Sequence, residues 1–534
     1  MSHIGIPPCD AGAILHGATA APCPPAARRW TLVAAILGSS LAFIDGTVVN
    51  VALPAIQREL NASASELQWV MESYALLLAA LLLVGGVLGD RYGRRRVFMF
   101  GAALFVAASV GCALSGTAAL LIAARAVQGA GAALMVPGSL ALISATFPQA
   151  ERGAAIGTWS AFSGITAAVG PVIGGALVDH YSWTWAFLVN LPLGLVLLAI
   201  CALKVPESKG TGPGQTANDP VDWLGAVLAT LGLAGVVYAL IQAPAEGWSS
   251  ATVMGAGMLG VAALACFVRV EAKSAAPMLP LHLFRERNFA GTNLLTLLLY
   301  AALGGGLYFL PLNLIQVQGM GATAAGAALL PFIAIMFTLS RWAGTLVDKF
   351  GAKLPLVIGP TIAAAGFALF TWPGVGSSYW SEFLPAICVL GLGMSITVAP
   401  LTTTAMNAVG AAHAGMASGV NNAVSRAAGL LAIAAFGIVL AWAFDAQLDA
   451  ALAHVKAPPE LLASVLAQRQ KLAGIAIPAG TPANGAQALH QAIGAAFVAG
   501  FRWVMGLCAV LALLSALSAW LLIDGKRPAL APHA

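Results

Sequence analysis

The sequence predicts an all-α integral membrane protein built from two related six-helix bundles, with two further helices inserted between them. Three observations support this fold class. The 534-residue chain is 60% hydrophobic and 8% charged, whereas soluble domains carry about 25% charged residues. Long apolar runs recur along the chain. A short arginine- and glycine-rich link at 86–96, between two of these runs, is repeated in weaker form at 344–353.

Membrane-spanning helices need about 20 predominantly apolar residues, and by this rule the chain contains fourteen spans. Hydropathy alone leaves thirteen or fifteen spans open. The expected limits are 30–53, 67–89, 97–117, 119–142, 155–178, 183–203, 222–242, 251–269, 289–316, 326–347, 355–372, 381–402, 415–442 and 496–523.

The spacing of the repeated link fixes the expected layout. Asp90 and Asp348 occupy the same place in the two copies and are 258 residues apart, whereas the first six spans end near residue 203. The excess corresponds to the two inserted spans. The expected parts are a tail at 1–29, a bundle at 30–203, the linker and inserted helices at 204–288, a bundle at 289–523 with a long extracytoplasmic loop at 443–495, and a tail at 524–534. A short amphipathic helix around 459–472 is expected in that loop.

The distribution of positive charge predicts the orientation. Of the 25 Lys and Arg residues, 17 lie in loops on one side of the membrane and five on the other. Cytoplasmic loops carry the excess of Lys and Arg, so both termini are expected in the cytoplasm. The expected location is the inner membrane of a bacterial cell. The net charge of +5 is too small to indicate nucleic-acid binding.

Asp45 is the leading intramembrane acid. A charge at the centre of a membrane helix costs about 2.5–3.5 kcal/mol on insertion scales, and such residues are usually functional. Desolvation disfavours the ionised form of a carboxylic acid, so Asp45 is a candidate proton carrier that should face an aqueous passage. The alternative is a carboxylate permanently tied to a neighbour. Arg125 lies at a similar depth in its own span, about 9–12 Å below the outer surface at 1.5 Å per residue. We expect it to pair with Asp45, or else only to brace helices through backbone carbonyls.

Two further charged residues are candidates for proton coupling. Glu72 is expected near the outer mouth of its span, where it either attracts cationic substrates or is a solvated rim residue. Arg426 is expected near the midplane of the second bundle, beside Asn421 and Asn422. Because an unpaired arginine there is expensive, it either reaches across to the first half or faces a wet cavity.

Four motifs in this order resemble those of the major facilitator superfamily, and most closely those of its fourteen-helix drug:proton antiporter branch. Asp45-x-Thr-Val-Val-Asn-Val-Ala-Leu-Pro54 is similar to the first-helix signature of that branch. The link 86–96 is similar to the cytoplasmic loop motif. Arg125-x-x-Gln-Gly-x-Gly131 is similar to the fourth-helix motif, and Gly170-Pro-x-x-Gly-Gly175 to the fifth-helix motif that marks exporters. The resemblance implies the major facilitator fold, no cofactor and transport driven by a proton gradient.

Two motifs have expected mechanical roles. The charged link is expected to act as a latch that holds one conformation, although its arginines are also explained by membrane topology alone. The expected latch residues are Gly86, Asp90, Arg91, Gly93, Arg94 and Arg95, with Asp348, Lys349 and Gly351 in the repeat. Small residues let membrane helices approach closely, and proline bends a helix. Gly170, Pro171, Gly174 and Gly175 are therefore expected to form a hinge and seal between the halves, or ordinary tight packing.

The expected substrate cavity is aromatic and poor in charge. Its candidate residues are Asn50, Trp69, Tyr74, Gln128, Tyr300, Tyr308, Met394, Asn421 and Asn422. Apolar pockets with few polar groups favour bulky amphipathic molecules, including cations, over sugars or phosphates. Most of these aromatic residues would also be explained by packing or lipid anchoring.

The predicted function is proton-coupled export of drugs or other amphipathic compounds by alternating access. The alternatives are a dedicated exporter of one metabolite, such as an antibiotic or a siderophore, and a proton-linked importer. The sequence contains no Gly-x-x-x-x-Gly-Lys-[Ser/Thr] phosphate-binding loop, and its scattered histidines and cysteines suggest neither an enzyme nor a metal site. The expected partners are a small-molecule substrate, protons and the bilayer. The resemblance also allows a periplasmic adaptor protein and an outer-membrane channel.

Overall fold

The computed structural model describes residues 25–209, 222–274, 277–344, 346–409 and 414–524. Every regular element within these ranges is a helix. Most of the predicted N-terminal tail, residues 210–221 of the linker and nearly all of the C-terminal tail lie outside the described residues.

The predicted spans are confirmed as helices. Thirteen helices in the described ranges are long and apolar enough to cross a membrane, and a shorter apolar helix of 17 residues covers Lys353–Leu369. Together they match the fourteen predicted spans one for one. At about 1.5 Å per residue, the shortest still reaches about 26 Å, close to the thickness of the hydrocarbon core.

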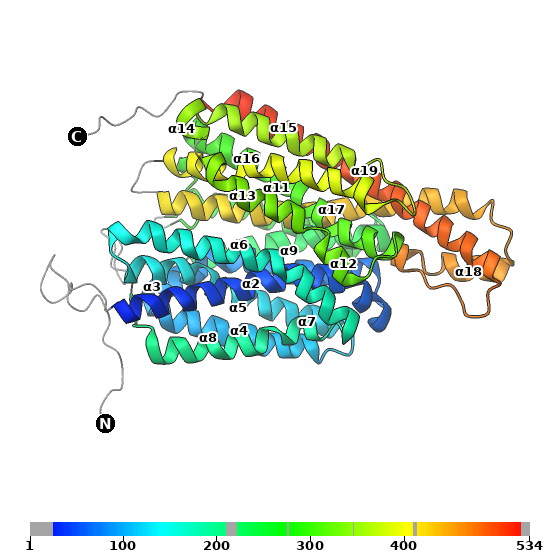
Figure 1. Cartoon of the computed structure of the whole chain (residues 1–534), viewed down its shortest axis with the longest axis horizontal. Coiled ribbons are helices and arrows are strands. Elements are labelled where there is room, and N and C mark those ends of the chain that lie inside the picture. Colours follow the sequence, from blue (N-terminus) through cyan, green and yellow to red (C-terminus); the bar gives the residue numbers. More distant parts are fainter. Residues whose placement is uncertain (1–24, 210–221, 275–276, 345, 410–413, 525–534) are drawn as a thin grey trace, which may run out of the picture. The chain divides into compact units, whose positions relative to one another are not determined.

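The chain forms two compact units, which we call unit 1 and unit 2. Unit 1 comprises the described residues up to Ala52, Trp69–Ala234 and Leu259–Leu279. Its elements are the first part of α2 (Pro25–Leu60), most of α3 (Ala64–Tyr92), α4 (Arg94–Ala113), α5 (Ala118–Thr146), α6 (Gln149–His180), α7 (Trp185–Leu188), α8 (Asn190–Lys204), and parts of α9 (Trp223–Glu246) and α10 (Ala251–Glu271) (Figure 1).

Unit 2 comprises Leu53–Gln68, Gly235–Met258 and the described residues from Pro280 onward. Besides parts of α2, α3, α9 and α10, its elements are η1 (Leu281–Arg285), α11 (Arg287–Leu312), η2 (Asn313–Val317), α12 (Ala322–Ala327), α13 (Leu330–Gly344), α14 (Leu346–Phe350), α15 (Lys353–Leu369), η3 (Tyr379–Phe383), α16 (Leu384–Asn407), α17 (Ala414–Leu452), α18 (Pro459–Leu466), η5 (Arg469–Gly474) and α19 (Ala483–Leu522). This division runs through four helices, and the bundle boundaries expected near 203 and 289 stay predictions.

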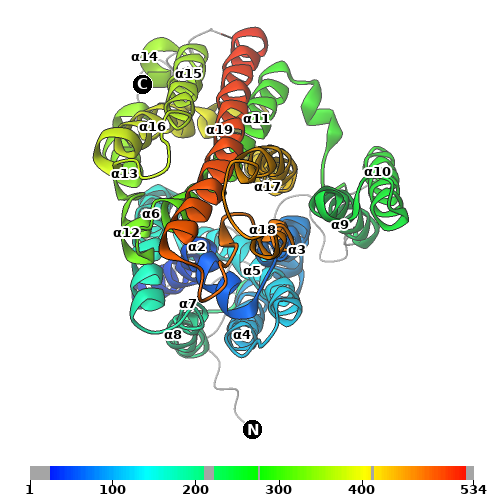
Figure 2. The same cartoon turned by 90° about the vertical axis from the view of Figure 1, so that its right-hand side faces the viewer.

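The predicted loop at 443–495 is too long. Helix α17 continues to Leu452 and α19 begins at Ala483, so the connection covers only 453–482 (Figures 1 and 2). Hydropathy ends a span where polar residues begin, whereas alanine-rich sequence continues as helix because alanine has the highest helix propensity. The short helix expected around 459–472 is present as two pieces, α18 and η5. We call residues 453–482 the excursion.

Local sequence explains where two of the helices begin. Before α3, the Ser63 amide and hydroxyl donate to Glu66 at 2.8 and 2.9 Å, and the Glu66 amide donates to the Ser63 hydroxyl at 3.2 Å. This reciprocal arrangement is a capping box. Before α5, the Thr117 hydroxyl accepts a hydrogen bond from the Leu120 amide at 3.3 Å. Each cap satisfies backbone donors that the first turn of a helix leaves unpaired.

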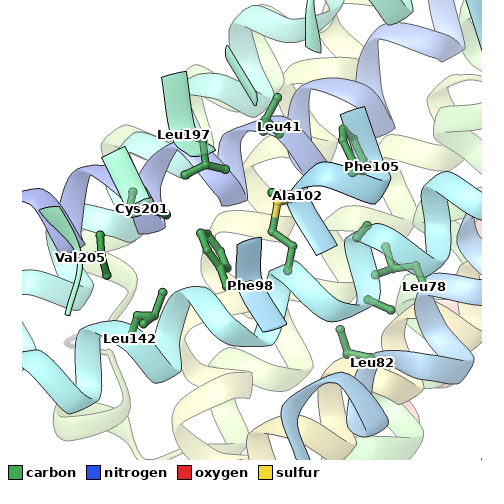
Figure 3. Close-up of a cluster of buried hydrophobic side chains, with 14 of the residues drawn as sticks. Leu41, Leu78, Leu82, Phe98, Ala102, Phe105, Leu142, Leu197, Cys201 and Val205 are labelled. Atoms are coloured by element: carbon green, nitrogen blue, oxygen red, sulfur yellow. The ribbon is translucent and has the colours of Figure 1, made fainter. Parts of the chain in front are cut away.

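A buried apolar cluster forms the core of unit 1 (Figure 3). It joins Leu41 of α2, Leu78 of α3, Phe98 of α4, Leu142 of α5 and Leu197 of α8, all of which are buried. Because this core draws on five helices, it positions the helices that carry the sequence motifs of the first half and the polar side chains on them.

Glycines let α4 and α5 approach at backbone distance. A Cβ atom on Gly131 would lie 2.7 Å from the Phe105 nitrogen and 2.9 Å from the Gly101 oxygen. A Cβ on Gly101 would lie 2.8 Å from the Gly131 oxygen. Real Cβ atoms do not approach backbone atoms this closely, so each position needs glycine.

We therefore expect Gly131→Ala to destabilise the protein by about 1–3 kcal/mol, the usual cost of overpacking a close contact. Gly164→Ala is the matched control, because a Cβ there meets nothing within 4 Å. Thermal unfolding of the two variants, purified in one detergent, measures the difference. Equal melting temperatures for both variants would contradict the close packing of α4 on α5.

Candidate functional site

The structure brings Asp45 and Arg125 together inside unit 1. Asp45 lies on α2 and Arg125 on α5, and the Arg125 Nη1 donates to Asp45 Oδ2 in an ion pair. Both side chains have no exposed surface. Asp45 therefore does not face an aqueous passage in this conformation, contrary to the expectation from sequence, and proton exchange with water requires the site to open.

Neutral side chains complete the hydrogen bonding of the Asp45 carboxylate. Its Oδ1 accepts from Gln128 Nε2 at 2.7 Å and from Asn190 Nδ2 at 3.0 Å. The Ser109 hydroxyl accepts from the same two amides, at 2.7 and 3.3 Å. Gln128, expected in a substrate cavity, is therefore part of the charge network. Sequence reasoning missed Asn190 and Ser109, because a neutral amide and a hydroxyl in apolar helices are ordinary there.

The Arg125 guanidinium has further partners in unit 1. Its Nη1 donates to Gln128 Oε1 at 2.7 Å, and its Nε donates to the carbonyl oxygen of Val70 at 3.1 Å. Its Cζ lies 4.3 Å from the ring centroid of Tyr74 and 5.7 Å from that of Phe187. Cation–π contacts are strengthened by desolvation. Arg125 thus pairs with Asp45, as expected, and also braces α3 through the Val70 carbonyl. The alternative that it only braces helices does not hold in this structure.

Glycines of two motifs shape this site. A Cβ on Gly129 would lie 3.0 Å from the Tyr74 Cα, so glycine there lets α5 approach α3. On α6, a Cβ on Gly170 would lie 3.5 Å from the Ile44 Cα, and one on Gly174 would lie 3.1 Å from the Val48 Cα. The fifth-helix motif therefore packs on the stretch of α2 that carries the carboxylate.

The remaining residues of that α6 segment fit the same packing. Pro171 lies inside α6, and Gly175 is buried. Gly157 and Gly164, by contrast, face open space, so the close-packed face is shorter than the run of glycines. A role for Gly170, Pro171, Gly174 and Gly175 as a hinge and seal between the halves stays a prediction.

Glu72 is not a solvated rim residue. It has no exposed surface, and neither carboxylate oxygen has a hydrogen-bond partner among the described residues. Glu72 lies on α3 between Val70 and Tyr74, both of which contact Arg125. A buried carboxyl without a partner is expensive to ionise, so Glu72 is a second candidate for holding a proton.

The link between α3 and α4 is fixed by an acid that the sequence analysis did not single out as a site residue. Glu207, just beyond α8, accepts a hydrogen bond from the Arg95 amide at 2.9 Å. Its Oε2 lies 3.7 Å from Nε of Arg95 and of Arg96. Gly93 has φ of +111°, and a Cβ there would lie 2.8 Å from the Glu207 carboxyl carbon. Glycine is needed at 93 both for its backbone conformation and for its contact with Glu207.

The other predicted latch residues take local roles. Asp90 accepts from Arg94 Nε at 2.8 Å, one turn along the chain. Arg91 lies over the Tyr92 ring, 5.5 Å from its centroid. Gly86 lies beside Pro137 of α5, where a Cβ would be at an ordinary contact distance of 3.8 Å.

In the weaker copy of the link, Gly351 has φ of +77° and Lys349 is exposed. The side chain of Asp348 lies outside what the structure describes. The copies therefore share a glycine with left-handed backbone at the same place, and the acidic part of the second copy stays a prediction.

The predicted polar residues of unit 2 form a separate group. Asn421 Nδ2 donates to the Thr296 hydroxyl at 2.7 Å and to Asn293 Oδ1 at 3.3 Å. Arg426 Nε donates to Asn422 Oδ1 at 3.2 Å. Arg426 therefore has an amide partner on its own helix, and its proposed role in proton coupling stays a prediction.

The other cavity candidates are spread through the chain. Tyr308 lines a cavity of about 280 Å³ in unit 2. Met394 is buried, whereas Trp69 and Tyr300 are partly buried. Asn50 donates to the Gly46 carbonyl of its own helix at 3.4 Å. Tyr74 and Gln128 belong to the network around Arg125 instead.

The arrangement in unit 1 is a buried charge pair. Breaking a buried pair by removing one partner costs about 3–5 kcal/mol, because the other charge is left uncompensated. We expect Arg125→Gln to lower the stability of the protein by this amount, and Asp45→Asn combined with Arg125→Gln to recover part of the loss.

Thermal unfolding of the purified single and double variants tests this coupling. The control is Arg469→Gln, which removes an ion pair to Asp449 whose side chains are 40% and 57% exposed. Such pairs contribute about 0–1 kcal/mol. If the double variant were as unstable as the sum of the single losses, Asp45 and Arg125 would not be energetically coupled.

Comparisons with known proteins identify the family. The family model described as Major Facilitator Superfamily matches residues 35–433. The chain is 36% identical over 455 residues to the multidrug resistance protein Stp of Mycobacterium tuberculosis, covering 85% of this chain and 82% of that protein. It is 32% identical over 500 residues to the tetracenomycin C resistance and export protein of Streptomyces glaucescens, covering 92% and 90%.

A solved structure is similar in fold. It is that of a bacterial homologue of the human lysosomal transporter Spinster in an inward-facing, unoccupied conformation. The TM-score is 0.67 at 16% identity, and the match covers 95% of this chain and 100% of that chain. The motifs, the helices and these similarities agree: the chain belongs to the Major Facilitator Superfamily, in the branch of its drug-resistance transporters.

Proposed function

We propose that this protein exports drugs or other amphipathic compounds, cations among them, in exchange for protons. The relatives above are described as resistance and export proteins, which supports the direction and the substrate class. The single observation that carries the proton coupling is the fully buried pair of Asp45 and Arg125 inside apolar helices. Intramembrane charges of this kind mark proton relays and substrate pathways.

In the proposed cycle, protonation of Asp45 removes the charge that Arg125 neutralises. The guanidinium then keeps only its bonds to Val70 and Gln128 and its ring contacts, and the contact between α2 and α5 weakens. A cationic substrate would have the same effect by competing with Arg125 for the carboxylate. Because proton and substrate would each favour the opened site, their exchange follows from competition for one charge. Glu72 and Arg426 are proposed as secondary proton-coupling residues.

Alternating access by rocking of two halves around a central site is the proposed large-scale motion, as paired repeats suggest. The link 86–96, held to Glu207, is proposed as the latch of this motion. We place the protein in a bacterial inner membrane with both termini in the cytoplasm, from the Lys and Arg asymmetry. A periplasmic adaptor and an outer-membrane channel remain proposed partners.

A dedicated exporter of a single metabolite is the second candidate. The relative from Streptomyces glaucescens is described as a tetracenomycin C resistance and export protein, and a further relative as a probable actinorhodin transporter. Both candidates share the proton-driven mechanism and differ in how many compounds are exported. Efflux measured over a panel of unrelated dyes and antibiotics separates them.

We expect Asp45→Asn to abolish efflux of a fluorescent dye against its gradient, because the amide cannot carry a proton. A protonophore should lower dye efflux by the wild-type protein to the level of the Asp45→Asn variant. Dye efflux from loaded whole cells measures both, with Asp449→Asn, an exposed carboxylate, as the matched control. Full-rate uphill efflux by Asp45→Asn would refute Asp45 as the proton carrier.

We expect Asn190→Leu to lower the stability of the protein by about 1.5–3 kcal/mol, the contribution of a hydrogen bond to a charged group, because Asn190 donates to the Asp45 carboxylate at 3.0 Å. In an Asp45→Asn background the same substitution should cost less, because the charge is absent. Thermal unfolding of the single and double variants measures both losses. Equal losses in the two backgrounds would mean that Asn190 serves packing only.

A further inference from the structure

Two acids meet at the ends of the inserted helices, outside the Asp45 network. Asp222 directly precedes α9, and Glu271 is the last residue of α10. Both belong to unit 1, and the loops that carry them are expected on the cytoplasmic side. Glu271 is only 2% exposed, and Asp222 is partly buried. The mechanism proposed above makes no use of this pair.

One oxygen of each carboxyl group holds the backbone. Asp222 Oδ1 accepts a hydrogen bond from the Gly225 amide at 2.7 Å, which satisfies a free donor in the first turn of α9. Glu271 Oε2 accepts from the amide of Leu279 at 3.0 Å. Leu279 is the residue at which unit 1 ends. The Glu271 carboxyl group therefore ties the end of α10 to the segment that precedes η1.

The other oxygen of each carboxyl group has no donor. Asp222 Oδ2 and Glu271 Oε1 are buried and lack a hydrogen-bond partner among the described residues. A Cβ on Gly225 would lie 2.8 Å from each of these two atoms, so both point toward one place, where the two side chains interact. An ionised carboxylate only accepts hydrogen bonds. Two facing carboxyl oxygens can therefore bond to each other only through a proton.

The charges around the pair favour such a proton. Within the described ranges, Asp222 is the charged group that acts on Glu271. Helix α9 carries no basic residue. The basic residues of α10, of the turn after it and of η1 form no ion pair with either acid in the described part of the chain; they are Arg269, Lys273, His282 and Arg285. Two carboxylates that share a site do not readily ionise together, so one of them is expected to keep its proton.

A metal ion fits the pair less well than a proton. Mg²⁺ and Ca²⁺ take about six to eight oxygen ligands, whereas each carboxyl group here has only one oxygen left unbonded. Among the described residues, no group of three or more His, Cys, Asp and Glu side chains could hold a metal ion. A single proton, by contrast, turns one oxygen into a donor and leaves the other as its acceptor.

We propose that Asp222 and Glu271 form a proton-binding site, which holds one proton between the two carboxyl groups. The bound proton fixes the start of α9, the end of α10 and the segment up to Leu279 to one another. When the pH rises and this proton leaves, the two carboxylates repel each other and the contact opens. The site is separate from Asp45 and does not depend on the proposed export function.

Amide substitutions test the shared proton. In Glu271→Gln and in Asp222→Asn, the amide keeps the shape of the protonated carboxyl group and donates a hydrogen bond at every pH. Wild-type protein loses the bond as the pH rises, because its proton leaves. We therefore expect each variant to melt at the wild-type temperature near pH 5, and about 1–3 °C above it near pH 9. Glu460→Gln, which changes an exposed acid of α18, should show no such growing difference.

Infrared difference spectra of the purified full-length protein read the proton itself. We expect wild-type protein to show the C=O stretch of a protonated carboxyl group, which disappears as the pH is raised. Because one proton serves both acids, Glu271→Gln and Asp222→Asn should each remove this same band. The buried Glu72 carboxyl group is unchanged in both variants, so its contribution cancels when variant and wild type are compared. Glu460→Gln should keep the band.

Three results would overturn the proposal. The first is a melting-temperature difference that stays the same from pH 5 to pH 9 in both amide variants. The second is a carboxyl band that both variants retain. The third is stabilisation of the wild type by Mg²⁺ that Glu271→Gln abolishes, because the pair would then bind a metal ion. All three measurements use purified protein without a gradient, so a failure of dye efflux leaves them unaffected.

Discussion

The structure of unit 1 depends on one buried ion pair. Two charges without solvent contact are stable only if their geometry and remaining hydrogen bonds offset the loss of hydration. Asp45 meets this condition with an arginine and two amides. Arg125 bonds to a carbonyl and an amide and lies over aromatic faces, while its Nη2 has no hydrogen-bond partner among the described residues. These partners come from α2, α3, α5, α7 and α8. The position of each helix is therefore constrained by a polar centre as well as by the apolar core.

Two features make this centre suited to switching. Its neutral donors remain when a proton removes the charge, so the pair can separate without leaving every polar atom unsatisfied. The neighbouring Glu72 carboxyl has no partner among the described residues, so the region already contains an acid that is expensive to ionise. In unit 2, Asn421 bonds to an amide and a hydroxyl, and Arg426 has an amide among its partners.

The membrane spans and the main charged residues could be predicted from the sequence, because hydropathy and intramembrane charge are strong signals. Matching depths along two helices was enough to expect the pairing of Asp45 with Arg125. It missed Asn190 and Ser109 because neutral polar residues cost little in a membrane helix and carry no mark of their partners. The role of Glu207 was also missed. This residue lies in the predicted linker, and a local sequence pattern cannot reveal its contact with Arg95, which is 112 residues away in the chain. Helix ends beyond the apolar runs, as in α17, were missed because hydropathy measures lipid contact rather than helix formation.

The enclosed state of Asp45 limits how coupling can work. A carboxylate with no exposed surface cannot exchange a proton with water until a neighbouring helix moves. Helix α5 is held to α2 by the charge pair, but α6 meets the same stretch of α2 through Gly170 and Gly174. The α2 side chains fill the space at both glycines, since a Cβ on Gly170 would meet the Thr47 hydroxyl and one on Gly174 would lie 2.6 Å from the Val48 Cγ1. Small residues let membrane helices approach closely, so tight packing of α6 closes this side of α2, and the charge pair with α5 closes another.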